Sequence, residues 1–121
     1  MSNAKKLPDA ELDIMLLIWD ANGAVTANYI MDKIDKNWRK QTVLKLLSRL
    51  CERGFLCLTK DGRYNVYTVR VSKKEYVEKV TGDLLQILYC NSIVELVKTL
   101  YDSRMVSITD LKILKQFIEQ L

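Results

Sequence analysis

The stretch WRKQTVLKLLSRLCERG, residues 38–54, decides the fold predicted for this chain. Read as a helix, it has an apolar stripe at the spacing i, i+3, i+4 and i+7, because such positions share one helix face. The stripe consists of Val43, Leu46, Leu47 and Leu50. The opposite side carries Gln41, Lys45, Ser48 and Glu52. One face of this helix is therefore expected in a core, and the other is free to bind a partner.

Positive charge gathers around the same helix. Residues 36–63 contain eight Lys or Arg and two acidic residues, a net charge of +6, whereas the whole chain carries +4. Residues 1–72 hold twelve basic and eight acidic residues, and residues 73–121 hold seven of each. This division indicates an N-terminal part that binds a polyanion and a neutral C-terminal part with another role.

Length and residue types narrow the possible functions. With 121 residues, 49% of them apolar, the chain has room for one ordinary domain and an accessory element. The cysteines, Cys51, Cys57 and Cys90, form no paired motif and there is no histidine, so we expect no disulfide framework, metal site or cofactor. An acid–base pair, a phosphate loop and a nucleophile motif are also missing from the sequence, which argues against an enzyme.

The sequence carries no targeting signal for a membrane. No apolar run reaches the length that crosses a bilayer, and the N-terminus lacks the apolar region of a signal peptide. We therefore expect a cytoplasmic protein that makes no contact with a membrane.

Two helices are predicted before residue 38. The first covers about residues 9–21, with Asp9 as its N-cap and Asn22–Gly23 as its end. Its inward positions are predicted to be Leu12, Met15, Leu16 and Trp19. Thr26 is expected to cap a second helix that runs to about Asp35, with Ile30 and Ile34 facing inward.

After Gly54 the periodicity changes to that of strands. Residues 55–59 and 64–69 are rich in aromatic and β-branched side chains, and they flank the Asp61–Gly62 pair, a strong hairpin signal. Three helices followed by a hairpin predict a winged helix-turn-helix domain, which we place at residues 5–71. The fold class is mainly α with a small β-hairpin.

Residues 72–121 return to helical spacing. Helices are predicted from Ser72 through Leu88, over 93–101, and after a capping box formed by Ser107 and Asp110. Three short helices cannot bury this much apolar surface on each other, so we expect a helical dimerisation region rather than helices folded back on the winged helix. The dimerisation residues are predicted to be Leu84, Leu88, Ile93, Leu96, Val97, Leu100, Leu111, Leu114, Ile118 and Leu121, the last four on the final helix.

The pattern favours sequence-specific binding of duplex DNA by a recognition helix at about Arg39–Arg53 in the major groove. Polar side chains that reach base edges give specificity, whereas cations on phosphates give affinity. Base readers are predicted to be Gln41, Thr42, Leu44, Lys45 and Ser48. The full DNA-binding set adds Thr26, Arg39, Lys40, Arg49, Lys60 and Arg63. The alternative is a winged-helix module that binds another protein through its hairpin or its C-terminal helices.

Four segments resemble the winged-helix part of the penicillinase repressor family (BlaI/MecI/CopY), in the same order and spacing over about residues 9–69. They are Ala10–Met15 with Ile18–Trp19, Val25–Ala27, Thr42–Val43 with Leu46–Leu50, and Arg53–Leu56. The resemblance implies a homodimeric transcriptional repressor on a palindromic operator. It also implies that Gln41, Thr42, Lys45 and Arg49 face DNA.

The chain departs from this family at three places. Some relatives have a basic residue at the position of Leu44 and a small polar one at that of Lys45, which implies a different operator. In the resistance repressors, release follows proteolysis at an Asn-Phe bond in the dimerisation region, signalled by a membrane sensor. The best-matching bond here is Thr99–Leu100, which argues against a sensor protease as a partner. The copper-responsive branch has paired C-terminal cysteines, whereas only Cys90 lies in that region.

Overall fold

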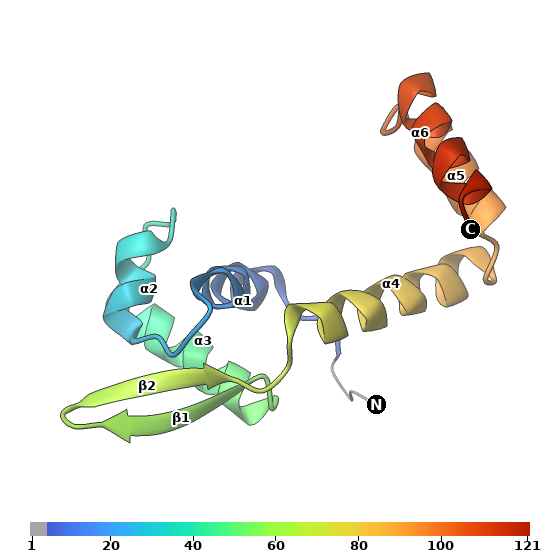
Figure 1. Ribbon diagram of the computed structural model, residues 1–121. Helices are drawn as coiled ribbons and strands as arrows, with labels where there is room; N and C mark the ends of the chain where they lie inside the picture. Colours follow the sequence, from blue (N-terminus) through green and yellow to red (C-terminus); the bar gives the residue numbers. More distant parts are fainter. Residues whose placement is uncertain (1–4) are drawn as a thin grey trace. The chain divides into compact units, whose positions relative to one another are not determined.

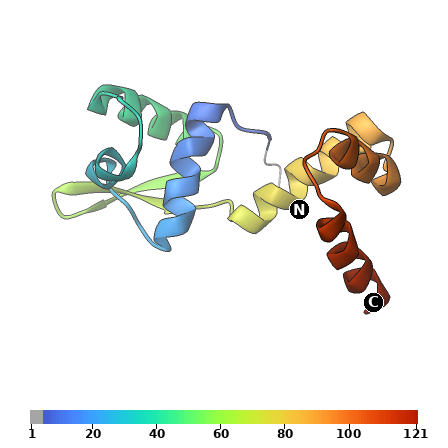
Figure 2. The same cartoon turned by 90° about the horizontal axis from the view of Figure 1, so that it is seen from above.

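The computed structural model describes residues 5–121, which divide after Val80 into two compact units. The elements, labelled in Figure 1, are α1 (Asp9–Ala21), α2 (Ala27–Lys33), α3 (Lys40–Glu52), β1 (Leu56–Asp61), β2 (Tyr64–Val69), α4 (Lys73–Tyr89), α5 (Ile93–Asp102) and α6 (Ile108–Glu119). Three helices precede an antiparallel hairpin, and Figures 1 and 2 show the hairpin alongside the helices. The predicted fold class is confirmed.

Helix α1 spans the predicted residues but differs in its cap and its buried face. Pro8 is the N-cap and Asp9 is the first helical residue, so the predicted capping role of Asp9 is wrong. The buried residues are Glu11, Ile14, Met15 and Ile18. Leu16 is exposed, and Leu12 and Trp19 are only partly buried. Apolar residues occur around most of α1, so periodicity alone did not select the face that packs.

Helix α2 has the predicted cap and a shorter length. The backbone N–H of Tyr29 donates to the Thr26 hydroxyl at 3.1 Å, which satisfies one of the free donors of the first turn. The helix ends at Lys33, and Ile34 is extended and partly buried instead of helical. The predicted end at Asp35 is therefore two residues too late.

Helix α3 has the predicted inward stripe. Val43, Leu47 and Leu50 are fully buried and Leu46 nearly so. Gly54 ends the helix with φ +81°, a backbone conformation that suits glycine, and the Phe55 N–H donates to the Leu50 carbonyl at 2.9 Å. The chain thereby turns from α3 directly into the hairpin.

The wing is the hairpin of β1 and β2. Asp61 pairs with Tyr64, so the loop consists of Gly62, with φ +64°, and Arg63. Strand β2 also bonds to the segment before α2. The Val25 N–H donates to the Tyr67 carbonyl at 3.1 Å, and the Tyr67 N–H donates to the Val25 carbonyl at 2.8 Å. These bonds attach the wing to the start of α2.

The first core extends into α4. The ring of Tyr76 lies 5.6 Å from that of Trp19 and 5.7 Å from that of Phe55, and its hydroxyl accepts a hydrogen bond from the Leu7 N–H at 2.8 Å. Because of these contacts the start of α4 belongs to the first unit, which ends at Val80. The functional boundary between residues 71 and 72 stays a prediction.

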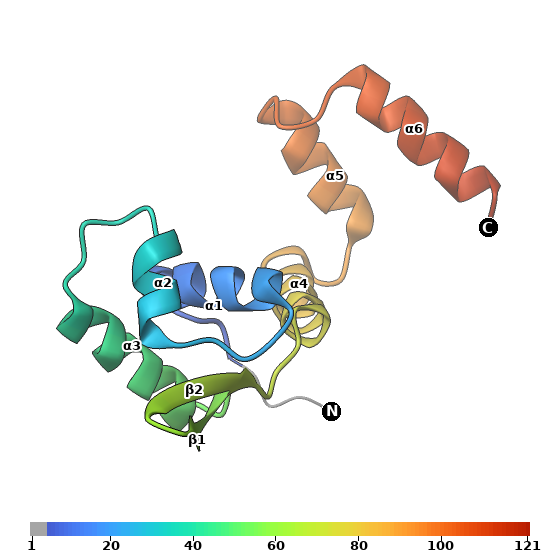
Figure 3. The ribbon, with the colours of Figure 1, turned by 60° about the vertical axis from the view of Figure 1, so that its left-hand side comes forward.

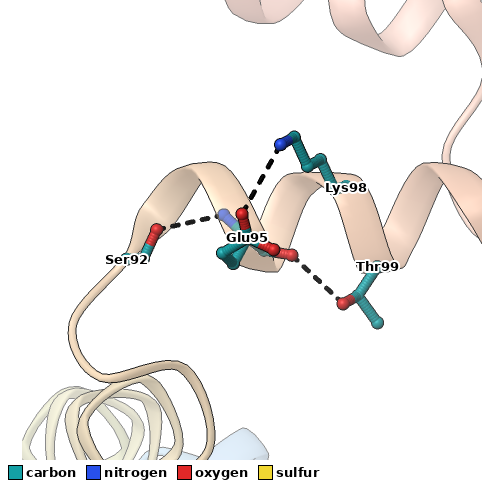
Figure 4. A network of polar contacts seen from close by, with 4 residues as sticks. All are labelled: Ser92, Glu95, Lys98 and Thr99. Carbon is teal, nitrogen blue, oxygen red and sulfur yellow. Dashed lines mark hydrogen bonds and ion pairs between the residues drawn. The ribbon is translucent and has the colours of Figure 1, made fainter.

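The second unit, Thr81–Leu121, contains the end of α4 with α5 and α6. Figure 3 shows α5 and α6 as two helices joined by a loop. Left-handed residues Cys90 and Asn91 end α4, which makes an 87° bend with α5. The Ser92 hydroxyl caps α5 by accepting a hydrogen bond from the Glu95 N–H. The Lys98 ammonium donates to the Glu95 carboxylate at 3.5 Å, and the Thr99 hydroxyl donates to the Glu95 backbone carbonyl at 3.1 Å (Figure 4). Neither α5 nor α6 contains a buried residue.

The predicted capping box of the last helix is confirmed. The Asp110 N–H donates to the Ser107 hydroxyl at 3.1 Å, and the Ser107 N–H donates to the Asp110 carboxylate at 2.8 Å. Helix α6 ends at Glu119, however, so Leu121 lies beyond it. The prediction that this helix carries Leu121 is wrong, because Gln120 is its C-cap. The Gln120 and Leu121 N–H groups donate to carbonyls three residues back, those of Phe117 at 3.1 Å and Ile118 at 3.2 Å.

Candidate nucleic-acid interface

The outward side of α3 is a continuous polar surface. Because Val43, Leu46, Leu47 and Leu50 anchor the helix in the core, the residues between them point to solvent. Besides Glu52 in the last turn, the exposed residues are Lys40, Gln41, Thr42, Leu44, Lys45, Ser48 and Arg49. These are seven of the eleven predicted DNA-binding residues, and Arg39 precedes them as the exposed N-cap. We call this exposed side of α3, with Arg39, the α3 surface.

The cations of the α3 surface and the wing form no ion pair within the described residues 5–121. Of the eight basic residues in 36–63, two are held by acids of α1: Lys36 contacts Asp13 at 3.9 Å, and Arg53 contacts Glu11 at 2.8 Å. Within residues 5–121 the other six form no ion pair: Arg39, Lys40, Lys45, Arg49, Lys60 and Arg63. Their charge is available to an external anion.

A hollow of about 270 Å³ lies where three segments meet. It is lined by Thr26, Ala27, Asn28, Lys40, Leu44, Arg63, Tyr64, Asn65 and Tyr67. The structure thus brings together four predicted residues from separate elements. We call this the wing hollow. Gln41, Thr42, Lys45, Ser48 and Arg49 lie outside it on α3, and Lys60 pairs with Asn65 across the hairpin.

Sequence reasoning missed three polar residues of the wing hollow, namely Asn28, Tyr64 and Asn65. Tyr64 and Asn65 were read only as strand residues, and Asn28 only as part of a short helix. Their position directly after the Asp-Gly turn and the Thr26 cap was the available signal. That signal does not show that the two segments meet, because their contact depends on the bridge between Val25 and Tyr67.

Ionisation beneath this surface follows from burial. Burial raises the pKa of the Tyr67 hydroxyl above its usual value, and the nearby Cys51 raises it further. Burial also raises the pKa of the Cys51 thiol, with added contributions from Cys57 and Glu52. Both groups are therefore neutral at physiological pH and add no negative charge beneath the surface.

Metal sites and membrane-spanning helices are two further kinds of feature that a chain of this size can carry. Residues 5–121 contain no group of three or more His, Cys, Asp or Glu placed to hold a metal ion. No single helix there is long and apolar enough to cross a membrane, and only α4 with α5, sharply bent, meet the length and composition as a pair.

The three helices, the bonded wing and the unpaired cations define a winged-helix protein with a basic exposed helix. Two solved structures of BlaI have the same fold. The DNA-binding domain of the repressor BlaI aligns with a TM-score of 0.54 at 29% identity, covering 63% of this chain and 94% of that one. The same values hold for the monomeric form of Bacillus licheniformis BlaI in complex with the blaP half-operator.

Residues 7–120 match the sequence profile described as penicillinase repressor. The chain belongs to the penicillinase repressor family, as its sequence predicted. The penicillinase repressor of Bacillus licheniformis is 28% identical over 121 residues, covering 96% of this chain and 94% of the relative. The methicillin resistance regulatory protein MecI of Staphylococcus aureus strain N315 is 28% identical over 86 residues, or 69% of each chain.

Proposed function

We propose that this protein is a transcriptional repressor that binds a specific duplex DNA sequence through α3. The observation that carries the proposal is the α3 surface, whose cations have no partner within the described chain. The relative BlaI, whose DNA-binding domain has the same fold, has been solved with a half-operator. A major groove about 12 Å wide admits an α-helix, so α3 enters with its exposed side toward the base edges.

The side chains of the α3 surface divide by chemistry. Gln41 pairs with adenine and Lys45 donates to guanine, while Leu44 contacts a thymine methyl group. Thr42 and Ser48 donate to bases or phosphates. The flanking cations, Arg39, Lys40 and Arg49, with Lys60 and Arg63 of the wing, contact phosphates and fix the orientation of the protein on the duplex.

The repressor acts as a homodimer through its second unit. Support comes from α5 and α6, which have no buried residue although each carries large apolar side chains. Exposed apolar surface of this extent marks an interface, and a second copy covers it symmetrically. Two copies then place two α3 helices on half-sites of a palindrome about one helical turn, or a multiple of it, apart.

The proposed dimer interface includes more residues than the sequence predicted. Of the ten predicted residues, Leu96, Val97, Leu100 and Leu111 are partly buried within their own chain, and the other six are exposed. Further large apolar side chains are also exposed in this unit: Ile87, Val94, Met105, Ile108, Ile113 and Phe117.

A sensor protease has no place in the proposal. The Thr99–Leu100 bond differs from the Asn-Phe bond of the resistance repressors, and it lies inside α5. The Thr99 carbonyl accepts a hydrogen bond from the Ser103 N–H at 3.0 Å, so this backbone is helical and internally bonded. Cleavage there would first require the helix to open.

Selection of duplexes from a random library, followed by fluorescence anisotropy, tests the proposed function. We expect one family of palindromic sequences to be enriched and to bind far more tightly than a scrambled duplex of equal length. Equal binding of both duplexes would contradict the proposal that the protein is a sequence-specific repressor. Binding of a protein partner that survives loss of the Lys45 and Arg49 charges, without DNA preference, supports the protein-interaction module instead.

A further inference from the structure

We propose that the wing hollow is the seat of one backbone phosphodiester of the bound duplex, held by Arg63 and Lys40 with Asn28, Tyr64 and Asn65. This inference rests on the proposed function and adds three residues that sequence reasoning did not assign. It also separates the cations of this surface by role. Arg63 and Lys40 fix the register of the protein on the DNA, whereas Lys45, which lies outside the hollow, reads a base.

The lining of the wing hollow is chemically matched to an anion. Two of its nine residues, Lys40 and Arg63, are cationic and none is acidic. Four more offer neutral hydrogen-bonding groups: Thr26, Asn28, Tyr64 and Asn65. Arginine matches the geometry of phosphate oxygens in a bidentate manner, and lysine supplies a point charge beside it. The combination favours phosphate over a neutral or cationic ligand.

A second recess of the same unit is less suited to an anion. A cavity of about 620 Å³ beside α1 is lined in part by the carboxylates Asp13, Asp20 and Asp35. It also contains three lysines, Lys33, Lys36 and Lys73, so its formal charge is balanced instead of positive, and Lys36 already contacts Asp13 at 3.9 Å. Carboxylates at the surface repel a phosphate, so the polyanion is expected at the wing hollow and not at this larger recess.

The walls of the wing hollow are held in place before any ligand arrives. The two backbone hydrogen bonds between Val25 and Tyr67 join the start of α2 to β2. The hydroxyl oxygen of Thr26 accepts from the Tyr29 N–H, which leaves its own proton free to donate. Preorganised donors lose little entropy when they bind, so a phosphate gains affinity from each of them.

The size and position of the hollow select a phosphodiester over free phosphate. Its volume of about 270 Å³ has room for a phosphate together with part of its sugar. Leu44 belongs both to this lining and to the proposed base-reading set, so the hollow borders the path of the groove. A phosphate seated there with its sugar continues into the duplex.

Binding measurements with Arg63→Ala and Asn65→Ala test the inference, with Arg70→Ala as the matched control. Arg70 is an exposed arginine at the other end of the hairpin and lies outside the wing hollow. We expect Arg63→Ala to weaken the selected duplex and the scrambled duplex by the same factor, about tenfold, and to reduce the slope of log K against log salt by about one phosphate contact. Asn65→Ala is expected to weaken both duplexes by a smaller common factor, and Arg70→Ala to leave binding unchanged.

A scan of single methylphosphonate substitutions in the selected duplex identifies the contact. One neutralised position per half-site should weaken the wild-type protein and leave Arg63→Ala unaffected, because that variant has already lost the contact. The inference is overturned if no such position exists, if Arg63→Ala and Arg70→Ala behave alike, or if inorganic phosphate occupies the hollow while the duplex stays bound.

The two proposals fail in different ways. If wild-type protein shows no preference between the selected and scrambled duplexes, the proposed repressor is wrong. If wild-type protein keeps its preference and the effect of Arg63→Ala differs from sequence to sequence, the proposed repressor function is kept and the phosphate site in the wing hollow is rejected. Circular dichroism of Arg63→Ala, expected to match wild type because Arg63 has no internal partner in the described chain, excludes misfolding.

Discussion

The guanidinium Nε of Arg53 donates to the carboxylate Oε1 of Glu11 across 2.8 Å, and this bond joins the end of α3 to the first turn of α1. The Glu11 side chain is 2% exposed and that of Arg53 is 45% exposed. One partner is therefore buried while the other reaches water. The two residues are 42 positions apart in the sequence.

This asymmetry predicts unequal effects of removing the partners. Arg53→Ala leaves a buried carboxylate unpaired and should lower the free energy of unfolding by about 3 kcal/mol. Glu11→Gln keeps an acceptor for Arg53 and should lower it by about 1 kcal/mol. Urea denaturation followed by circular dichroism measures both. The control is Lys36→Ala, which breaks the exposed pair with Asp13 and should change stability by less than about 1 kcal/mol. Equal losses for Arg53→Ala and Lys36→Ala would contradict the prediction.

Lys45 is predicted to discriminate between DNA sequences. If its ammonium donates to guanine, Lys45→Ala should reduce affinity for the selected duplex by about 10- to 100-fold and affinity for a scrambled duplex much less. Fluorescence anisotropy at one fixed salt concentration measures both. Lys74→Ala removes the same charge from an exposed position at the start of α4 and serves as the control. A uniform loss on both duplexes would reassign Lys45 to a phosphate.

Phe117 is predicted to lie in the dimer interface. Its side chain is 58% exposed on α6 although it is large and aromatic. Phe117→Glu places a charge in the proposed apolar contact and should weaken dimerisation by at least about tenfold. Sedimentation velocity across a concentration series measures this. Gln116→Glu makes the same charge change at an adjacent exposed position and should leave the dimer intact. A wild-type monomer at micromolar concentration would refute the dimer itself.

Asp110 should titrate below the usual pKa of an aspartate. Its hydrogen bonds from the backbone N–H and side chain of Ser107 favour the charged form and lower the pKa from its ordinary value of 3.8. The capping box therefore stabilises α6 fully above that value, and the contribution is lost as pH falls through the lower pKa of the folded state. Carboxyl carbon chemical shifts of Asp110 report the pKa. Ser107→Ala should return it only part of the way toward 3.8, because the backbone N–H of residue 107, the larger cause, remains. An unchanged pKa in that variant would disprove the link.

Cys90 and Cys51 should react in a defined order. Cys90 is exposed, whereas burial raises the pKa of Cys51 and reduces its reactive thiolate at neutral pH. Iodoacetamide should therefore modify Cys90 before Cys51, and modification of Cys51 should accelerate as pH rises. Peptide mass spectrometry over time measures the order. Faster modification of Cys51 at neutral pH would show that the end of α3 opens readily.

The sequence predicted those parts of the fold whose signals are local. The α3 stripe, the Thr26 cap, the hairpin around Asp61–Gly62 and the Ser107 capping box each lie within a few residues of chain, and all are confirmed. The loop of the hairpin is shorter than predicted, because Lys60 and Asp61 belong to β1. The family followed from such segments as well. The assignments of the α3 surface to DNA and of the second unit to dimerisation remain predictions.

What the sequence did not predict depends on residues that are far apart. Glu11 is charged, so periodicity placed it outside the core, and only its bond to Arg53 explains its burial. The inward face of α1 was misassigned because apolar residues surround that helix. The wing hollow combines segments around residues 26, 40 and 63, and no local pattern indicates that they meet.

The attachment of β2 at Val25 and Tyr67 has an evolutionary consequence. The wing is joined to the helices there by main-chain groups, which nearly every amino acid supplies. The side chains of the α3 surface take no part in that attachment. Mutations on this surface can therefore accumulate over generations while the scaffold keeps its geometry. A lineage built on this scaffold is free to change the sequence it recognises without first acquiring a new fold.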